Sequence, residues 1–136
     1  MKCIVFTIGE YLFGADIEDV KEVGKKKNAK IISSGKGFSI IKYRDKNFVI
    51  FELSEIFDLK DAKLENILFF SKFDDIGVTI GEIKGMFDVK EKSIPRDILE
   101  LKYIKSFGDL EDKTIFIIDT DQIAKRKKIK GLIKSV

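Results

Sequence analysis

Residues 40–57 read IIKYRDKNFVIFELSEIF, and this stretch decides the fold. Ile40 and Ile41 open a first strand, and a polar turn follows at 45–47. The next four residues, FVIF at 48–51, are β-formers too apolar for an exposed strand. We therefore predict a buried hairpin. The apolar residues behind it fall at helical offsets after Ser54, which predicts a short closing helix.

The same pattern occurs a second time. Residues 44–52 (RDKNFVIFE) and 111–119 (EDKTIFIID) both read charge, Asp, Lys, polar, four apolars and an acid, at an offset of 67. Residues 14–23 and 77–86 share apolar spacing at an offset of 63. Two matches at nearly one offset predict two structurally similar halves of roughly 65 residues. The alternative is chance, because apolar runs in β proteins resemble one another.

The length favours halves that share a core. A unit of half this length buries only about 60% of its unfolded surface, whereas a chain of 136 residues buries about 68%. We predict a single domain, residues 1–136, made of two similar β-barrel halves with the boundary near 58–66. The sequence holds no run of eighteen apolar residues, so we expect no membrane insertion. The first residues are charged too soon for a signal peptide, which predicts a cytoplasmic protein.

Missing residue types exclude most enzyme mechanisms. The chain has no histidine, which removes His-based acid–base catalysis, Ser-His and Cys-His pairs, and zinc sites that need imidazole. Its single cysteine, Cys3, cannot form an intrachain disulfide. Gly35-Lys36-Gly37 lacks the strand-then-helix context of a dinucleotide loop. We expect no enzyme, no catalytic residue, no small-molecule substrate, no cofactor and no metal.

Charge raises a second class of function. The net charge is +3, and lysines gather at 25–27 and, with one arginine, at 125–128. With twelve Phe, this composition suits a small basic nucleic-acid-binding β-barrel protein, since such barrels stack bases on aromatic faces. Binding would then depend steeply on salt. The lysines lie in a loop and a tail rather than among exposed aromatics, so we do not expect nucleic acid as a partner, and nucleic-acid binding is kept only as the alternative function.

Short strands with frequent turns dominate the remaining pattern. An N-terminal hairpin is predicted over 3–14, and 67–70 predicts a buried strand. Asp16 is a predicted N-cap for a short helix that ends at Gly24. Apolar residues spaced among lysines and arginine near the C-terminus predict an amphipathic helix. Its apolar positions are Ile123, Ile129, Leu132 and Ile133. Many short strands favour small barrels or a sandwich.

The order of these landmarks resembles the CheW-like domain, the chemotaxis coupling family. Residues 3–23 are similar to its first strand pair and the segment after it, and 41–45 (IKYRD) stand where the family has Ile-Asn-Leu-Arg-Gly. Residues 48–57 and 76–80 resemble later strands, and 103–104 with 115–119 resemble the closing hairpin. The resemblance extends from Cys3 to Ile123. It implies a mainly β fold: two SH3-like five-stranded β-barrels packed side by side, with short helices and a C-terminal helix.

The same resemblance implies a function. Family members are non-catalytic adaptors, or scaffolds, that couple chemoreceptors to the CheA histidine kinase in signal transduction. The implied partners are the regulatory domain of a CheA-type kinase and the cytoplasmic tip of a chemoreceptor. Lys42 and Asp45 replace the residues that flank the family arginine, and Gly81 replaces an acid. These departures leave the identity of the partner open.

Arg44 is the central candidate for partner binding. It ends a strand beside a turn, and a guanidinium can fix orientation through paired hydrogen bonds. Glu22 lies near the same surface by resemblance. The predicted partner-binding set is Arg44, Glu22, Lys42, Tyr43 and Asp45. The alternative is that Arg44 only forms a surface ion pair, which contributes about 0 to 1 kcal/mol.

Overall fold

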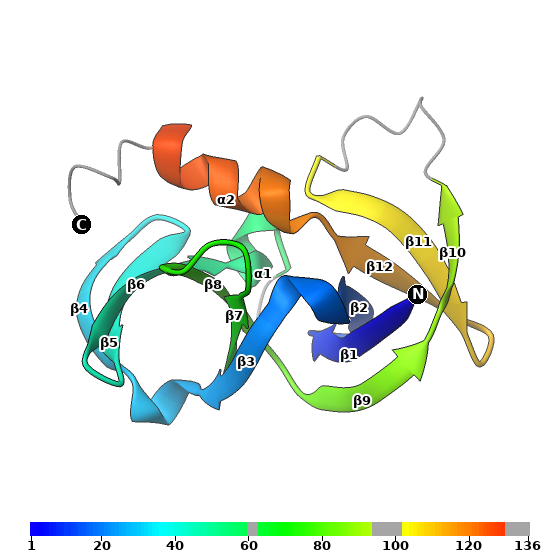
Figure 1. Cartoon of the computed structure of the whole chain (residues 1–136), viewed down its shortest axis with the longest axis horizontal. Coiled ribbons are helices and arrows are strands. Elements are labelled where there is room, and N and C mark those ends of the chain that lie inside the picture. The colour runs from blue at the N-terminus through cyan, green and yellow to red at the C-terminus, as the bar shows by residue number, and fades with distance from the viewer. Residues whose placement is uncertain (60–62, 94–101, 130–136) are drawn as a thin grey trace.

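Short strands make up most of the computed structural model, which describes residues 1–59, 63–93 and 102–129 (Figure 1). The strands are β1 (Lys2–Ile8), β2 (Tyr11–Asp16), β3 (Val20–Lys25), β4 (Lys30–Gly35), β5 (Phe38–Tyr43), β6 (Lys46–Glu52), β7 (Asn66–Phe70), β8 (Ile76–Ile80), β9 (Ile83–Asp88), β10 (Lys90–Ser93), β11 (Ile104–Leu110) and β12 (Lys113–Ile118). The helices are α1 (Leu53–Ile56) and α2 (Thr120–Ile129), with 3₁₀ turns η1 (Ile17–Asp19) and η2 (Lys26–Asn28).

The strands form two curled sheets of six. The first sheet has the order β10-β11-β12-β2-β1-β9, and the second has the order β4-β5-β6-β8-β7-β3. Figure 1 shows the two curled sheets side by side, with α2 starting beside β12 and running over one end of the second sheet. The mainly β, two-barrel fold class is confirmed. Each described sheet has six strands, where the resemblance implied five.

The two sheets have the same topology but draw on both halves of the sequence. β1 and β2 belong to the first sheet, whereas β3 to β6 belong to the second. The second half reverses this: β7 and β8 join the second sheet, and β9 to β12 join the first. Residues 58–66 therefore separate the sequence halves but not the sheets. The chain changes sheet after β2 and again after β8, so the predicted boundary does not divide one barrel from the other.

The predicted hairpin is confirmed, with its turn shifted toward the N-terminus. Tyr43 pairs with Lys46, so the turn consists of Arg44 and Asp45 alone. Their φ angles are 52° and 63°, positive at both positions as the type I′ turn of a two-residue hairpin requires. The second hairpin turns at Glu111 and Asp112 with φ of 49° and 66°. The two hairpins, 67 residues apart in the sequence, therefore also share the backbone conformation of their turns.

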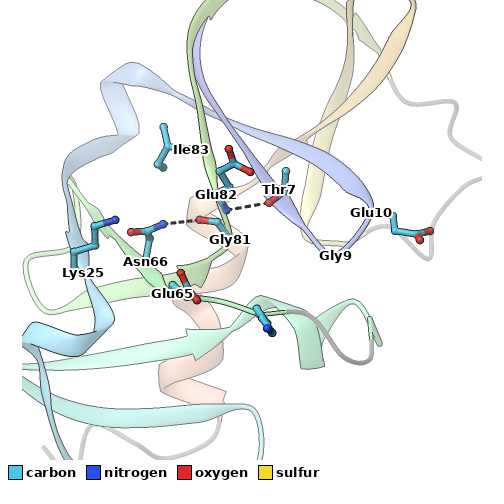
Figure 2. Close-up of a pocket in the computed structure, with 10 residues that line it drawn as sticks. Thr7, Gly9, Glu10, Lys25, Glu65, Asn66, Gly81, Glu82 and Ile83 are labelled. Atoms are coloured by element: carbon cyan, nitrogen blue, oxygen red, sulfur yellow. Dashed lines mark hydrogen bonds between the residues drawn. The ribbon is translucent and has the colours of Figure 1, made fainter.

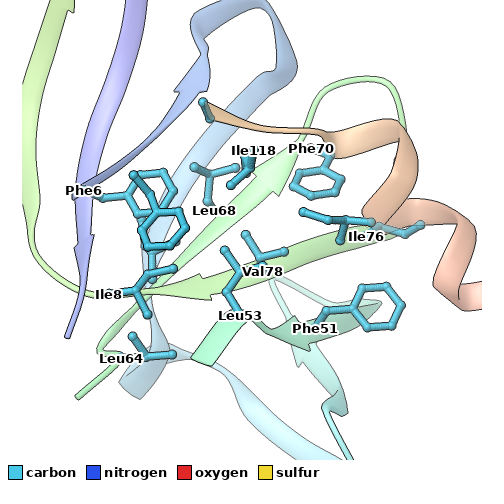
Figure 3. Packing of buried hydrophobic residues seen from close by; sticks show 14 of the residues in the cluster. Phe6, Ile8, Phe51, Leu53, Leu64, Leu68, Phe70, Ile76, Val78 and Ile118 are labelled. Carbon is cyan, nitrogen blue, oxygen red and sulfur yellow. The ribbon is translucent and has the colours of Figure 1, made fainter. Parts of the chain in front are cut away.

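The largest hydrophobic cluster spans both sheets, as the length argument predicted. Phe6 and Ile118 of the first sheet pack in it with Leu68 and Phe70 of the second (Figure 3). β6 and β7 bury both of their faces. Alternate residues of β6 and β7 join two residues of β5 in a separate cluster within the second sheet, made of Ile41, Tyr43, Phe48, Ile50, Ile67 and Phe69. Burial on both faces explains why these strands read as continuous apolar runs.

A third cluster lies within the first sheet. It holds Cys3, Val5, Val89, Ile115 and Ile117. Burial raises the pKa of the Cys3 thiol to about 11, with the Asp16 carboxylate contributing in the same direction. The thiol is therefore protonated and shielded at neutral pH, in agreement with its expected role as a strand residue.

The short helix predicted after Asp16 is wrong beyond its first turn. Asp16 does cap the turn, since its Oδ1 accepts a hydrogen bond from the Glu18 amide at 3.1 Å. The chain then enters β3, which pairs with β7. Val20 and Val23 are β-branched, and pairing with a strand far along the sequence overrides the local helical spacing. Gly24 is required there because an added Cβ would clash with the Tyr43 hydroxyl.

The predicted C-terminal helix is confirmed as α2. Ile123 and Ala124 pack into the cluster shared by the two sheets. Leu132 and Ile133, which were expected to continue its apolar face, lie outside the described residues. Within the described part of the chain, no helix is both long and apolar enough to cross a membrane.

Candidate functional site

Arg44 lies on the β5–β6 turn and reaches across to β3. Its Nη1 donates to Glu22 Oε2 at 2.8 Å, and its guanidinium carbon lies 5.2 Å from the centre of the Tyr43 ring. The Arg44 side chain is still 70% exposed, and that of Glu22 is 30% exposed. Two neighbouring groups thus set the direction of the guanidinium while most of it faces solvent.

A second set of charges extends this surface to the β7–β8 turn. Lys46 Nζ donates to the Asp74 carbonyl at 2.9 Å and lies 5.3 Å from the centre of the Phe48 ring. The Asp74 carboxylate is 4.0 Å from both Lys46 and Lys21. We call the group Glu22, Arg44, Lys46 and Asp74 the turn surface. Its charges alternate, so a partner must match a pattern rather than a net charge.

These ion pairs contribute little to folding. All of them are substantially exposed, and exposed pairs contribute about 0 to 1 kcal/mol each. The turn surface is therefore not needed to hold the barrel together. Its side chains can exchange their present partners for those of another protein at small cost.

One residue of the predicted set, Tyr43, is buried. Tyr43 is 5% exposed, and its ring centre lies 4.9 Å from that of Phe69 in the core of the second sheet. It can support Arg44 from below but has too little free surface to bind a partner. Lys42 is exposed in β5 beside the turn, Asp45 is exposed within the turn, and Glu22 contacts Arg44.

An apolar groove opens on another face. It encloses about 160 Å³ and is lined by Tyr11, Phe13, Phe57, Leu59, Ile104 and Phe116. Phe13 contacts Phe57 at a ring-centre distance of 5.1 Å and Phe116 at 5.4 Å. Tyr11 is half exposed at its rim. We call this the aromatic groove. Phe57 follows the second sheet whereas Phe13 and Phe116 belong to the first, so the groove lies where the two sheets meet.

A polar hollow lies where the chain passes from β8 to β9. It measures about 690 Å³, and its walls carry Lys25, Glu65 and Glu82 (Figure 2). The Asn66 amide donates to the Gly81 carbonyl at 2.7 Å, and Thr7 Oγ1 accepts from the Glu82 amide at 2.9 Å. These bonds tie β7 of the second sheet and β1 of the first sheet to the connection at 81–82. No group of three or more metal-ligating side chains occurs among residues 1–59, 63–93 and 102–129.

Sequence reasoning missed several of these residues. The contact between Lys46 and Asp74 was not predicted, because their proximity depends on β6 pairing with β8. The aromatic groove combines segments from four places in the chain. No local spacing could have shown that they meet.

The chain matches one protein family over most of its length. The matching family model is described as CheW-like domain and covers residues 2–128. The crystal structure of the scaffolding protein TtCheW from Thermoanaerobacter tengcongensis is similar, with a TM-score of 0.73 and 22% identity. The match covers 87% of this chain and 88% of that one. Among curated proteins, none matches significantly.

Proposed function

The chain belongs to the CheW-like domain family, and from this premise we propose that it is a cytoplasmic, non-catalytic chemotaxis scaffold. It would couple a chemoreceptor to a CheA-type histidine kinase. A scaffold needs two separate binding surfaces, and we assign these roles to the turn surface and the aromatic groove, which share no residue.

The turn surface is the proposed contact for the regulatory domain of the kinase. The observation that carries this proposal is an oriented arginine that remains mostly exposed, held by Glu22 and by the ring of Tyr43. Holding the side chain in place before binding reduces the entropy lost on association. A carboxylate or backbone carbonyl of the partner would complete the hydrogen bonds of the guanidinium.

The aromatic groove is the proposed contact for the helical tip of a receptor. Helices that dock in grooves insert apolar side chains at positions i, i+3 and i+7, and aromatic walls suit such anchors. An exposed groove of aromatic side chains is otherwise costly in water. The half-exposed Tyr11 at the rim could both pack against a helix and donate a hydrogen bond from its hydroxyl.

A titration tests the kinase contact. The isotope-labelled chain is titrated with the cognate kinase regulatory domain, and amide shifts are followed by NMR. We expect saturable binding, with the largest shifts at Glu22, Arg44 and Lys46. Unchanged spectra at tens of micromolar would refute the proposal. Shifts confined to the first sheet would place the kinase contact elsewhere.

A further inference from the structure

β4 is an exposed edge strand. It ends the second sheet, and all six of its residues are exposed. It pairs with β5 on one side, and its other side makes no backbone hydrogen bond to a described residue. Figure 1 shows it at the outer limit of the molecule. A free edge of this kind is a template for another strand.

Two aliphatic side chains stand on this edge. Ile31 is 54% exposed and Ile32 is 52% exposed. The pairing with β5 shifts register between Ile31 and Ser33, so Ile32 has no partner residue in β5. Adjacent exposed isoleucines on a strand provide apolar contact area for a polypeptide that lies alongside.

Unpaired positive charge surrounds the strand. Residues 25–42 contain six lysines and no acid, although the whole chain is only +3. None of the six forms an ion pair with a described residue, whereas lysines such as Lys46 and Lys72 do. Glu65 lines a second hollow together with Lys25, Lys26 and Lys27, but it forms no ion pair with these lysines. The lysines are Lys25, Lys26, Lys27, Lys30, Lys36 and Lys42.

We propose that β4 binds an acidic, extended segment of a partner protein by adding it to the second sheet as a further strand. The free backbone groups of β4 supply the pairing. The isoleucines contact aliphatic side chains of the segment, and the lysines select its carboxylates. A second copy of this chain is a poor occupant, because pairing two β4 edges would oppose six lysines with six. The proposal does not depend on the turn surface or the aromatic groove.

Backbone pairing with β4 distinguishes an acidic polypeptide segment from other anionic partners. Nucleic acid and anionic lipid could also use the lysines, but neither needs the unpaired strand edge. Nucleic acid would in addition need exposed aromatic rings for stacking. Tyr43 is buried and Phe38 is partly buried, so the described surface around β4 offers no exposed ring.

A peptide titration tests the proposal. The probe is an eight-residue peptide of alternating Glu and Val, compared with a Lys-Val version and with an acidic version that carries two prolines. We expect saturable binding of the first peptide alone, with amide shifts and slowed hydrogen exchange at 31–34. Binding of the proline peptide with equal affinity would overturn the proposal, because proline cannot complete the ladder.

Matched variants separate charge from backbone pairing. Changing Lys27, Lys30 and Lys36 together to Gln should weaken binding about tenfold. The control set, Lys2, Lys90 and Lys113 changed to Gln, lies in the first sheet and should change it less than twofold. Equal loss in the two sets would contradict the proposal.

The strand itself is tested at Ile32. Ile32→Pro should abolish binding, whereas Ile32→Thr, which keeps the amide donor, should retain most of it. Thermal unfolding shows whether each variant folds. If Ile32→Pro does not fold, the two sets of lysine variants test the proposal. Binding of oligothymidine or of phosphatidylglycerol vesicles, without binding of the acidic peptide, would overturn the proposal.

Discussion

At the scale of single residues, Arg44 combines an ordinary structural role with an unusual position. It occupies the left-handed region with φ of 52°, which non-glycine residues rarely adopt. Its pair with Glu22 is exposed and weak. Neither the backbone conformation of Arg44 nor its ion pair contributes much to the stability of the fold. This favours a role for Arg44 in binding.

Replacing Arg44 should therefore separate binding from stability. Arg44→Ala should lower the free energy of unfolding by less than about 1 kcal/mol. It should weaken binding of the kinase regulatory domain by about 1.5 to 3 kcal/mol, or roughly ten- to a hundredfold. Arg44→Lys should recover part of this loss, because an ammonium lacks the planar fork.

Calorimetry of binding and of thermal unfolding measures both effects, with Lys90→Ala as the control. Equal losses of binding and stability in Arg44→Ala would show that Arg44 is structural. Unchanged binding would place the recognition surface elsewhere.

Asp45 shows how the turn tolerates the loss of a family glycine. The resemblance places a glycine at this position, and the φ of 63° is one that glycine adopts without strain. Asp is among the few other residues that visit this region. Asp45→Gly should raise the free energy of unfolding by up to about 1 kcal/mol, and Asp45→Val should lower it by about 1 to 2 kcal/mol. Urea unfolding measures both, and a more stable Val variant would refute the argument.

At the scale of elements, the hairpins were predictable because their determinants are local. The polar turn, the flanking β-formers and the following acid lie within twelve residues, and both copies carry them. β3 was mispredicted because its pairing partner β7 lies more than forty residues away. The exchange of strands between the sheets was missed for the same reason. The burial of Tyr43 was not predicted, because its ring packs against Phe69 of β7, far along the sequence.

The crossing from β8 to β9 packs closely against β1. The Gly81 amide donates to the Thr7 carbonyl at 2.8 Å, and an added Cβ would lie 2.6 Å from that oxygen. Gly81→Ala should therefore lower the free energy of unfolding by about 1 to 3 kcal/mol. This also explains why the acid that the resemblance places here is absent. Chemical denaturation checks the value, and a neutral Ala variant would show that the crossing has room to move.

At the scale of the whole molecule, exchanged strands and a shared core should make the chain one cooperative unit. Each sheet contains strands from both sequence halves, and the largest cluster spans both sheets. The single domain over residues 1–136 remains a prediction that follows from this arrangement. Amide signals of Val5 in the first sheet and Ile67 in the second should vanish at one urea midpoint. Two separate midpoints would show that the sheets unfold independently.

The central claim is that one chain holds two partners at once. The direct measurement is sedimentation of the chain mixed with the kinase regulatory domain and a receptor tip fragment, together and in pairs. We predict a ternary 1:1:1 complex, with Arg44→Ala removing only the kinase domain and Phe57→Ala removing only the receptor fragment. Partners that displace each other from a single site, or that bind only separately, would contradict the scaffold account.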